Sequence, residues 1–595
     1  MTTAIANKID YQKRKNKELF KQLETNAFIG LSNAQNYIPV YKRYFDLNET
    51  NYNNINLNHK WSLSRVDASV NTTKCFKCVL SNGPTATKTK NVFFKMAPLL
   101  DPYKYMSGKY DIDISDPTLS MPTFAPSSVV HPKIMDYNNS SYVDGFFYYL
   151  SNRLLEQGFI NGIEYYGSFL GMKTKFTCNI IDDIEYLATS DFFNKNKGVL
   201  FDTEDYSNLL HNENESVRKR QHPLMISDEA IMLDIEDLDL EVKVKPDALH
   251  IVDSIVELEE VLNLSPMASK KASLKSDSSC SSRTSHTNSK DSVYESEEDE
   301  SDNESNDVEK ENVKEGEEIE DGESSGYEDV SDSSGQSFMD EDEEELNATI
   351  PKFPVLMIAI EHCHNTFDNL IRTNKLTNDE WFSALMQIVM ILLAYQKAYS
   401  MTHNDLHTNN VMFISTEKKY LYYYFNKTYY KVPTFGRIFK IIDFGRAIYK
   451  FNDALFCSDS FKVGGDASTQ YNTEPFMNDH KPRLDPNHSF DLCRLACSTF
   501  DYLIQDMREV KGKCEADAFV RIIVEWCLDD NGINVLYKNN GAERYPDFKL
   551  YKMIARHVHK HTPQAQLERK EFSKFAIQKQ GIKRGEPVMV IDDYC

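Results

Sequence analysis

The pattern of apolar and polar residues predicts two differently built parts of the chain. Between residues 60 and 182, apolar positions fall in short runs rich in aromatic and β-branched residues, such as HKWSLSRV, KCFKCVLSNG and NVFFKMAP, which are typical of strands. Within this part, residues 141–157 carry apolar residues at helical spacing instead. From residue 364 the pattern is mainly helical, with a long apolar helix at 380–398 and a tyrosine-rich hairpin at 418–432. We therefore expect an α+β protein with a β-rich part followed by a larger helical part.

Three further segments complete the predicted organisation. Residues 1–59 are expected to form an N-terminal extension, and residues 183–350 form an acidic insertion. From about residue 266 the composition of this insertion collapses to Ser, Glu, Asp, Asn and Gly, which predicts disorder because too little apolar surface can be buried to offset chain entropy. Structure is expected to resume with the buried strand FPVLMIAIEH, so that residues 351–363 lead into the helical part, 364–595.

The net charge is concentrated in one segment. Residues 291–350 hold 26 acidic residues against two lysines, which accounts for the whole formal net charge of −24. The remainder of the chain is formally neutral. Because no basic surplus is left over, we expect no direct contact with nucleic acid.

Cysteine usage and hydropathy bear on the compartment. The eleven cysteines show no disulfide-framework spacing, and the single CxxC, Cys75 and Cys78, has no second pair at zinc-site spacing. We interpret these two as strand cysteines and the thiols as reduced, which predicts a cytoplasmic protein. The first thirty residues are charged throughout and do not resemble a secretory signal. The longest apolar run, 384–395, is too short to span a bilayer, so no membrane span is expected.

Two short motifs carry the chemistry. The stretch THNDLHTNNVMFI contains His403, Asp405 and Asn410 in the pattern H-x-D-x-x-x-x-N, and FKIIDFGRA places Asp443 directly after an apolar strand. Together, and in this order, these stretches resemble the catalytic loop and the metal-binding DFG segment of the protein kinase superfamily. The resemblance implies that Asp405 is the catalytic base for an acceptor hydroxyl. It also implies that Asn410 and Asp443 bind the Mg²⁺, or Mn²⁺, that accompanies ATP.

The same resemblance assigns a nucleotide site. The segment 353–371 is similar to the fifth strand, hinge and following helix of a kinase, which makes Ile360 the gatekeeper and brings the backbones of Glu361 and Cys363 to the adenine edge. The stretch NVFFKMA is similar to the third strand and puts Lys95, as a catalytic and ATP-binding residue, on the phosphates.

Two acidic positions complete this comparison. The acid that pairs with Lys95 is expected on the helix at 141–157, where Asp144 and Glu156 are both candidates and spacing favours Asp144. Asp491, at the start of the helical stretch 489–504, is expected to support the catalytic loop structurally.

The sequence also departs from the kinase pattern. No G-x-G-x-x-G lies between the first two strands, where the chain reads RVDASVNTT. Asn404 replaces the usual arginine of the catalytic loop, which removes the clamp for a phosphorylated activation loop. His407 stands where serine/threonine kinases carry a lysine, and the resulting HNDLH is similar to the H-G-D-L-H loops of small-molecule kinases.

Taken together, the chain resembles the divergent serine/threonine kinases of large nucleocytoplasmic DNA viruses, of the mimivirus and iridovirus type. That resemblance implies a two-lobed protein-kinase-like fold with a β-rich small lobe, a mainly helical large lobe and the disordered acidic insertion in the small lobe. It further implies protein substrates with Ser or Thr, and a location in the host cytoplasm or in the virion. A small-molecule kinase of the aminoglycoside or choline type and a pseudokinase scaffold are the alternatives.

Overall fold

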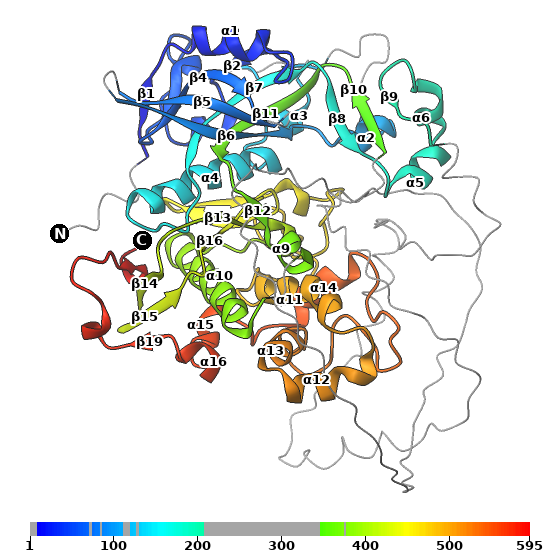
Figure 1. The fold of residues 1–595 in the computed structure, drawn as a ribbon. Coiled ribbons are helices and arrows are strands. Elements are labelled where there is room, and N and C mark those ends of the chain that lie inside the picture. The colour runs from blue at the N-terminus through cyan, green and yellow to red at the C-terminus, as the bar shows by residue number, and fades with distance from the viewer. Residues whose placement is uncertain are drawn as a thin grey trace, which may run out of the picture. The chain divides into compact units, whose positions relative to one another are not determined.

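In the computed structural model, the described residues are 9–70, 74–83, 86–110, 119–125, 130–206, 346–373 and 376–594, and all of them belong to one of the two compact units into which the chain divides (Figure 1). The disorder expected from about residue 266 lies outside the described residues. Ordered elements occupy both ends of the segment expected as the insertion, 183–206 and 346–350. These ends therefore belong to the folded structure.

A six-stranded antiparallel sheet, with strand order β2-β7-β11-β6-β5-β4, organises the N-terminal part (Figure 1). Its strands are β2 (Leu31–Gln35), β4 (Ser62–Ser69), β5 (Cys75–Asn82), β6 (Ala86–Pro98), β7 (Tyr165–Lys173) and β11 (Phe353–Glu361). Each of the nine residues of β11 is buried, as its uninterrupted apolar sequence predicts for a strand covered on both faces. Cys75 and Cys78 are free, buried cysteines on β5.

Helix α4 (Ser140–Glu156) packs against β7 and β11 of this sheet. Its first turn is capped by Asn139, whose side-chain oxygen accepts a hydrogen bond from the backbone N–H of Ser141. Gly145 allows a close approach, because a Cβ at this position would lie 2.7 Å from Cδ2 of Leu356 on β11. The absence of a side chain at this position therefore lets α4 pack closely against β11.

The N-terminal residues are part of this framework. After β1 (Tyr11–Lys13) and α1 (Lys17–Thr25), strand β2 pairs with β7 and extends the sheet. The structure thus differs from the expectation of a separate extension at 1–59. A second, three-stranded sheet with the order β8-β10-β9 joins the two ends of the expected insertion; its strands are β8 (Phe176–Asn179), β9 (Asp202–Thr203) and β10 (Asn347–Ile350). Two short helices, α5 (Ile184–Thr189) and α6 (Asp191–Asn196), lie between β8 and β9.

The C-terminal part is mainly helical. Its helices include α9 (Phe367–Thr373), α10 (Asn378–Tyr399), α11 (Phe490–Leu503), α12 (Val510–Ala516), α13 (Ala518–Trp526), α14 (Lys549–His557), α15 (Pro563–Gln566) and α16 (Lys570–Ser573). The expected hairpin is present as β14 (Tyr420–Phe425) and β15 (Thr428–Pro433), which pair with the short strands β20 (Met589–Val590) and β19 (Ala576–Ile577). The α+β class predicted from the sequence is confirmed.

Helix α10 is the core helix of this part. A complete capping box fixes its start, because Thr377 and Glu380 bond each other's backbone N–H groups. Among the described residues it is the one helix long and apolar enough to cross a membrane, and 83% of its most apolar window is buried inside the structure. This burial is compatible with the expected absence of a membrane span.

Candidate functional site

The loop between α10 and β13 (Val411–Ser415) carries the predicted base, Asp405, and α11 fixes its backbone. Both carboxylate oxygens of Asp491 accept backbone hydrogen bonds, from the N–H groups of His403 and Asn404, each at 2.9 Å. Asn404 has a φ of 65°, which lies in the left-handed region that asparagine tolerates better than most residues. Its side-chain oxygen accepts from the Tyr471 hydroxyl at 2.7 Å. Asp491 therefore supports this loop, as the sequence analysis expects.

The carboxylate of Asp405 is buried and held by two groups from elsewhere in the chain. Its Oδ1 accepts a 2.8 Å hydrogen bond from the Tyr551 hydroxyl on α14, and its Oδ2 lies 3.6 Å from the Arg446 guanidinium. Burial on its own raises the pKa of Asp405, but the nearby cations, Arg446 above all, and the Tyr551 bond hold the pKa well below its ordinary value. The carboxylate is therefore ionised at neutral pH.

Hydrogen bonds to backbone atoms tie Asn410 and the Asp443 turn to the loop that carries Asp405. The side-chain amide of Asn410 donates to the backbone oxygen of Asp405 at 2.9 Å, and the backbone oxygen of Asn410 accepts from Ile442 N–H, next to Asp443. Asp443 has a φ of 63°, and its backbone N–H donates to the Tyr148 hydroxyl on α4 at 2.9 Å. The strands β13 and β16 (Arg437–Ile441), which pair with each other, bring the two motifs together.

Lys95 on β6 joins this group to α4. Its Nζ lies 2.7 Å from Oδ2 of Asp144 and 2.9 Å from Oδ1 of Asp443. Burial on its own lowers the pKa of Lys95, but the two carboxylates outweigh it and the pKa is raised well above its ordinary value. Burial raises the pKa of Asp144 to about 6, against the opposing effect of Lys95. The lysine is therefore charged and bridges both acids.

The structure decides between the two candidate partners of Lys95. Glu156 lies at the end of α4, where its carboxylate accepts from the backbone of Lys60 at 2.7 Å and from the side chain of Asn152 at 2.9 Å. Asp144, in contrast, bonds Lys95 and also accepts from the backbone N–H of Phe444 at 2.7 Å. The pairing that spacing favours, Lys95 with Asp144, is the one observed.

The expected hinge residues, Ile360, Glu361 and Cys363, are buried at the end of β11. The side chain of Glu361 is engaged there by Lys440 on β16, whose ammonium lies 2.6 Å from Oε1 of Glu361 and 2.6 Å from the backbone oxygen of Gly162. This ion pair ties the end of the central strand to β16.

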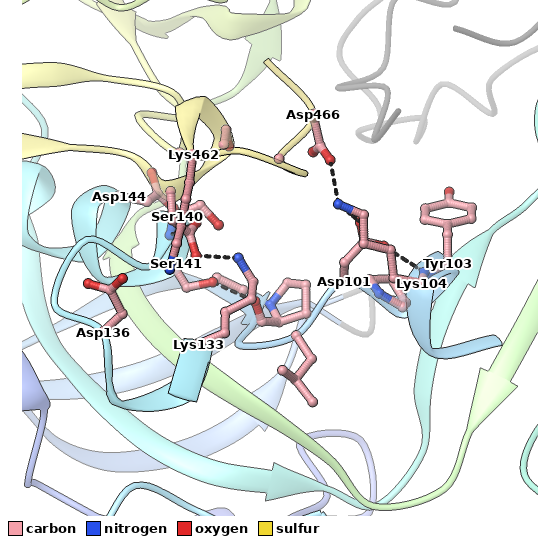
Figure 2. A pocket seen from close by; sticks show the side chains of 18 of the residues that line it. Asp101, Tyr103, Lys104, Lys133, Asp136, Ser140, Ser141, Asp144, Lys462 and Asp466 are labelled. Carbon is pink, nitrogen blue, oxygen red and sulfur yellow. Dashed lines mark hydrogen bonds and ion pairs between the residues drawn. The ribbon is translucent and has the colours of Figure 1, made fainter. Parts of the chain in front are cut away.

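A cleft with a volume of about 650 Å³ is lined by four of the predicted residues, namely Lys95, Asp144, Asp405 and Asp443. Figure 2 labels Asp144 among the lining residues. It extends away from β11 toward α2 (Pro102–Met106), α3 (Pro132–Met135) and the loop 459–466, so Ile360, Glu361 and Cys363 are not among its lining residues. On this far side Lys104 lies 3.6 Å from Asp466. The arrangement places the Asp405 carboxylate and a lysine-bridged pair of carboxylates around one cleft.

Several residues of the site were not anticipated from the sequence. Arg446 directly follows the Asp443 turn, and an arginine so close to an acidic motif was a usable signal in the sequence. Tyr148 lies four residues after Asp144, on the same face of α4, so helical spacing pointed to it. Tyr551 stands 146 positions after Asp405 and is marked by no local pattern.

Part of the chain is similar to a known protein. No family model matches the chain. A stretch of 182 residues, 30% of this chain, is 27% identical to a protein of Invertebrate iridescent virus 6 that bears the name "Uncharacterized protein 098R". The aligned stretch spans about a quarter, 26%, of that protein's length. The chain is thus similar over part of its length to an iridovirus protein, and this similarity carries no statement of activity.

Proposed function

We propose that this protein is an ATP- and Mg²⁺-dependent kinase with a two-lobed, protein-kinase-like fold that phosphorylates Ser or Thr residues of proteins. One observation carries the proposal: Lys95 bridges Asp144 and Asp443, and these three residues line the same cleft as Asp405. Phosphoryl transfer depends on positioning and on neutralising the charge of the triphosphate, and these residue types meet both demands.

The donor set fits the implied metal. Asp443 offers a carboxylate and Asn410 an amide oxygen, which are the hard ligands that Mg²⁺ prefers, and a nucleotide-bound ion takes its remaining ligands from phosphates and water. Among the described residues, no group of three or more His, Cys, Asp or Glu side chains is arranged to hold a metal alone. When bound, Mg²⁺ would neutralise charge on the phosphates.

Within this proposal each residue has one task. Lys95, held by Asp144, contacts the phosphates and orients them. Asp405 accepts the proton of the acceptor hydroxyl, and its hydrogen bond from Tyr551 keeps the carboxylate in one rotamer. Asp491 keeps the loop in place through two backbone N–H groups. The expected adenine contacts of Glu361 and Cys363 remain part of the proposal.

One observation favours a small-molecule acceptor as the second candidate. His407, two residues after Asp405, is buried, and neither of its ring nitrogens has a hydrogen-bond partner. Burial lowers its pKa to about 4, so it is a neutral imidazole and does not supply the charge of the lysine found there in serine/threonine kinases. A neutral ring at this place is closer to the H-G-D-L-H loops of aminoglycoside and choline kinases.

The deciding assay offers labelled ATP with a panel of proteins and, separately, with aminoglycosides and choline. Asp443→Ala should abolish transfer because it removes the carboxylate that would hold Mg²⁺, while Asp530→Asn, at an acid that is hydrogen-bonded to His559 outside the cleft, should retain transfer. Transfer to proteins supports the proposal, transfer to small molecules alone supports the second candidate, and nucleotide binding without transfer indicates a pseudokinase. Undiminished transfer by the Asp443 variant would refute the assignment of the site.

A further inference from the structure

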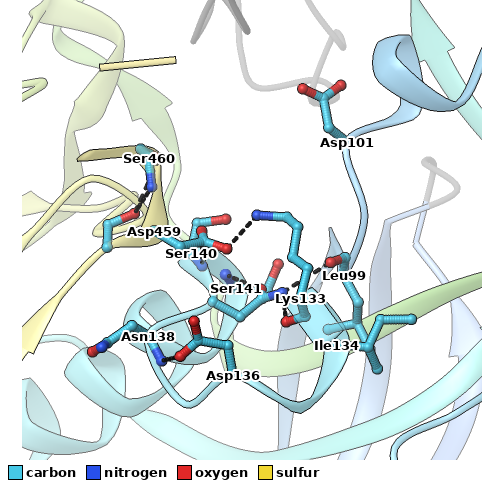
Figure 3. Close-up of polar contacts among 12 residues, drawn as sticks. Leu99, Asp101, Lys133, Ile134, Asp136, Asn138, Ser140, Ser141, Asp459 and Ser460 are labelled. Carbon is cyan, nitrogen blue, oxygen red and sulfur yellow. Dashed lines mark hydrogen bonds and ion pairs between the residues drawn. The ribbon is translucent and has the colours of Figure 1, made fainter. Parts of the chain in front are cut away.

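A carboxylate from the segment after Asp443 sits at the start of α4. Oδ1 of Asp459 accepts the backbone N–H of Ser140, the first residue of the helix, at 3.0 Å, and Oδ2 pairs with Lys133 on α3 (Figure 3). The backbone N–H of Asp459 also donates to the backbone oxygen of Asn138 at 2.8 Å. Asp459 is 6% exposed, so this contact is a buried, charge-assisted one.

Physical chemistry explains why an anion is stable there. The first turn of a helix presents unpaired N–H groups and a partial positive charge, and Lys133 adds a full one. Such a place suits a phosphate as well as a carboxylate. Here the chain fills it with its own side chain, so no covalent phosphate is needed.

The hydrogen bond between Asp459 and Ser140 is one of four that join residues 443–459 to α4. The Phe444 N–H bonds the Asp144 carboxylate at 2.7 Å, the Asp443 N–H bonds the Tyr148 hydroxyl at 2.9 Å, and the Tyr449 hydroxyl bonds the Val143 backbone oxygen at 2.9 Å. Asp144, which holds Lys95, lies one turn after Ser140. Because a helix is stiff over one turn, fixing its first residue also fixes where the Asp144 carboxylate points.

We infer that Asp459 and Lys133 are positioning residues for the Lys95–Asp144 ion pair, and that Asp459 supplies from the chain itself the anion that locks α4 in place. The inference rests on the proposed function only where the ion pair is taken to serve phosphoryl transfer. It predicts that the assembled site does not depend on phosphorylation of the segment after Asp443.

The first test measures hydrogen exchange of the backbone amides of residues 140–149 in the full-length protein. Asp459→Ala should raise exchange in the first turn by about tenfold or more, the effect of losing a charge-assisted hydrogen bond. Asp530→Asn is the matched control, since this acid accepts hydrogen bonds from His559 outside the cleft and should leave α4 unchanged. Wild-type exchange in Asp459→Ala would overturn the inference.

Chemical rescue separates an anion site from general loss of packing. Formate should restore protection in Asp459→Ala, whereas chloride at equal ionic strength should not, and the addition of Lys133→Met should weaken the rescue. Failure of formate to restore protection would contradict the anion role. Should Asp459→Ala not fold, Asp459→Asn and Lys133→Met provide the same comparison, with Asp459→Glu expected to stay close to wild type.

The activity arm tests the link to Lys95. In the Asp459 variant kcat should fall about tenfold while KM for ATP stays nearly constant, the pattern of a displaced group that acts in the transition state. A rise in KM for ATP with constant kcat would overturn the positioning role. If the wild-type protein transfers no phosphate, the proposed function fails, yet the exchange and rescue measurements still decide whether Asp459 locks α4.

Discussion

Replacing Lys440 tests the connection between the central strand and the helical part. The Lys440 side chain is 1% exposed and its ammonium bonds Glu361 at 2.6 Å, so Lys440→Met leaves the Glu361 carboxylate buried without its counter-charge. Breaking a buried ion pair by removing one partner lowers stability by about 3–5 kcal/mol, and we expect a loss in this range. The backbone N–H of Glu164 still donates to Glu361 at 2.8 Å in the variant. We therefore expect a stability loss near the lower end of this range.

The measurement is urea unfolding followed by the fluorescence of the three tryptophans. Lys450→Met, at an exposed position on β17 (Ile448–Phe451), is the control and should change stability by less than about 0.5 kcal/mol. Adding Glu361→Gln to Lys440→Met should recover most of the loss, because a neutral amide still accepts from Glu164. A loss below about 1 kcal/mol, or no recovery in the double variant, would refute the reasoning.

Three further outcomes follow from the site and the sheet. Asp405→Asn should bind nucleotide normally by calorimetry and lower turnover by about two orders of magnitude, the scale of general-base catalysis; near-normal turnover would contradict its role. Lys95→Met should reduce mainly kcat and couple to Asp144→Asn by more than about 0.5 kcal/mol in a double-mutant cycle, whereas Glu156→Gln should show no such coupling. Burial lowers the pKa of His59 from 6.5 to about 4, so the unfolded chain takes up a proton first and stability should fall as pH drops from about 6.5 toward 4. In His59→Asn, urea midpoints should lose that part of the pH slope, and an unchanged slope would show that other groups cause it.

Local patterns predicted the helices and strands well, because apolar periodicity within a short stretch of sequence determines which of the two forms. The helix expected at 141–157 is α4, Ser140–Glu156, and the buried strand FPVLMIAIEH is β11. The loop and turn that carry Asp405 and Asp443 were identified through their resemblance to two kinase motifs, because these motifs are short and continuous in the sequence. Whether the whole constitutes a kinase fold stays a prediction.

Contacts between segments that are distant in the chain could not be predicted from the sequence. Lys133 and Asp459 are 326 positions apart, and their ion pair depends on how α3 and the loop after Asp443 are brought together. Tyr551 reaches Asp405 for the same reason. Lys440 is an intermediate case: a lysine inside the apolar stretch FKIIDF is a candidate for burial, and a buried lysine needs a partner, but the sequence does not identify Glu361.

The order of strands in the six-stranded sheet has a consequence for biosynthesis. β11, inside the sheet, is made long after its neighbours β6 and β7, although it pairs with residues 92–98 of β6 and with almost all of β7. At about 5–20 residues per second, the ribosome needs roughly 10 to 40 seconds to pass from the end of β7 to the end of β11. During this interval each neighbour presents one open edge to other nascent chains and chaperones. The newly made protein therefore passes through a period in which its yield is decided by protection from aggregation rather than by the stability of the finished fold.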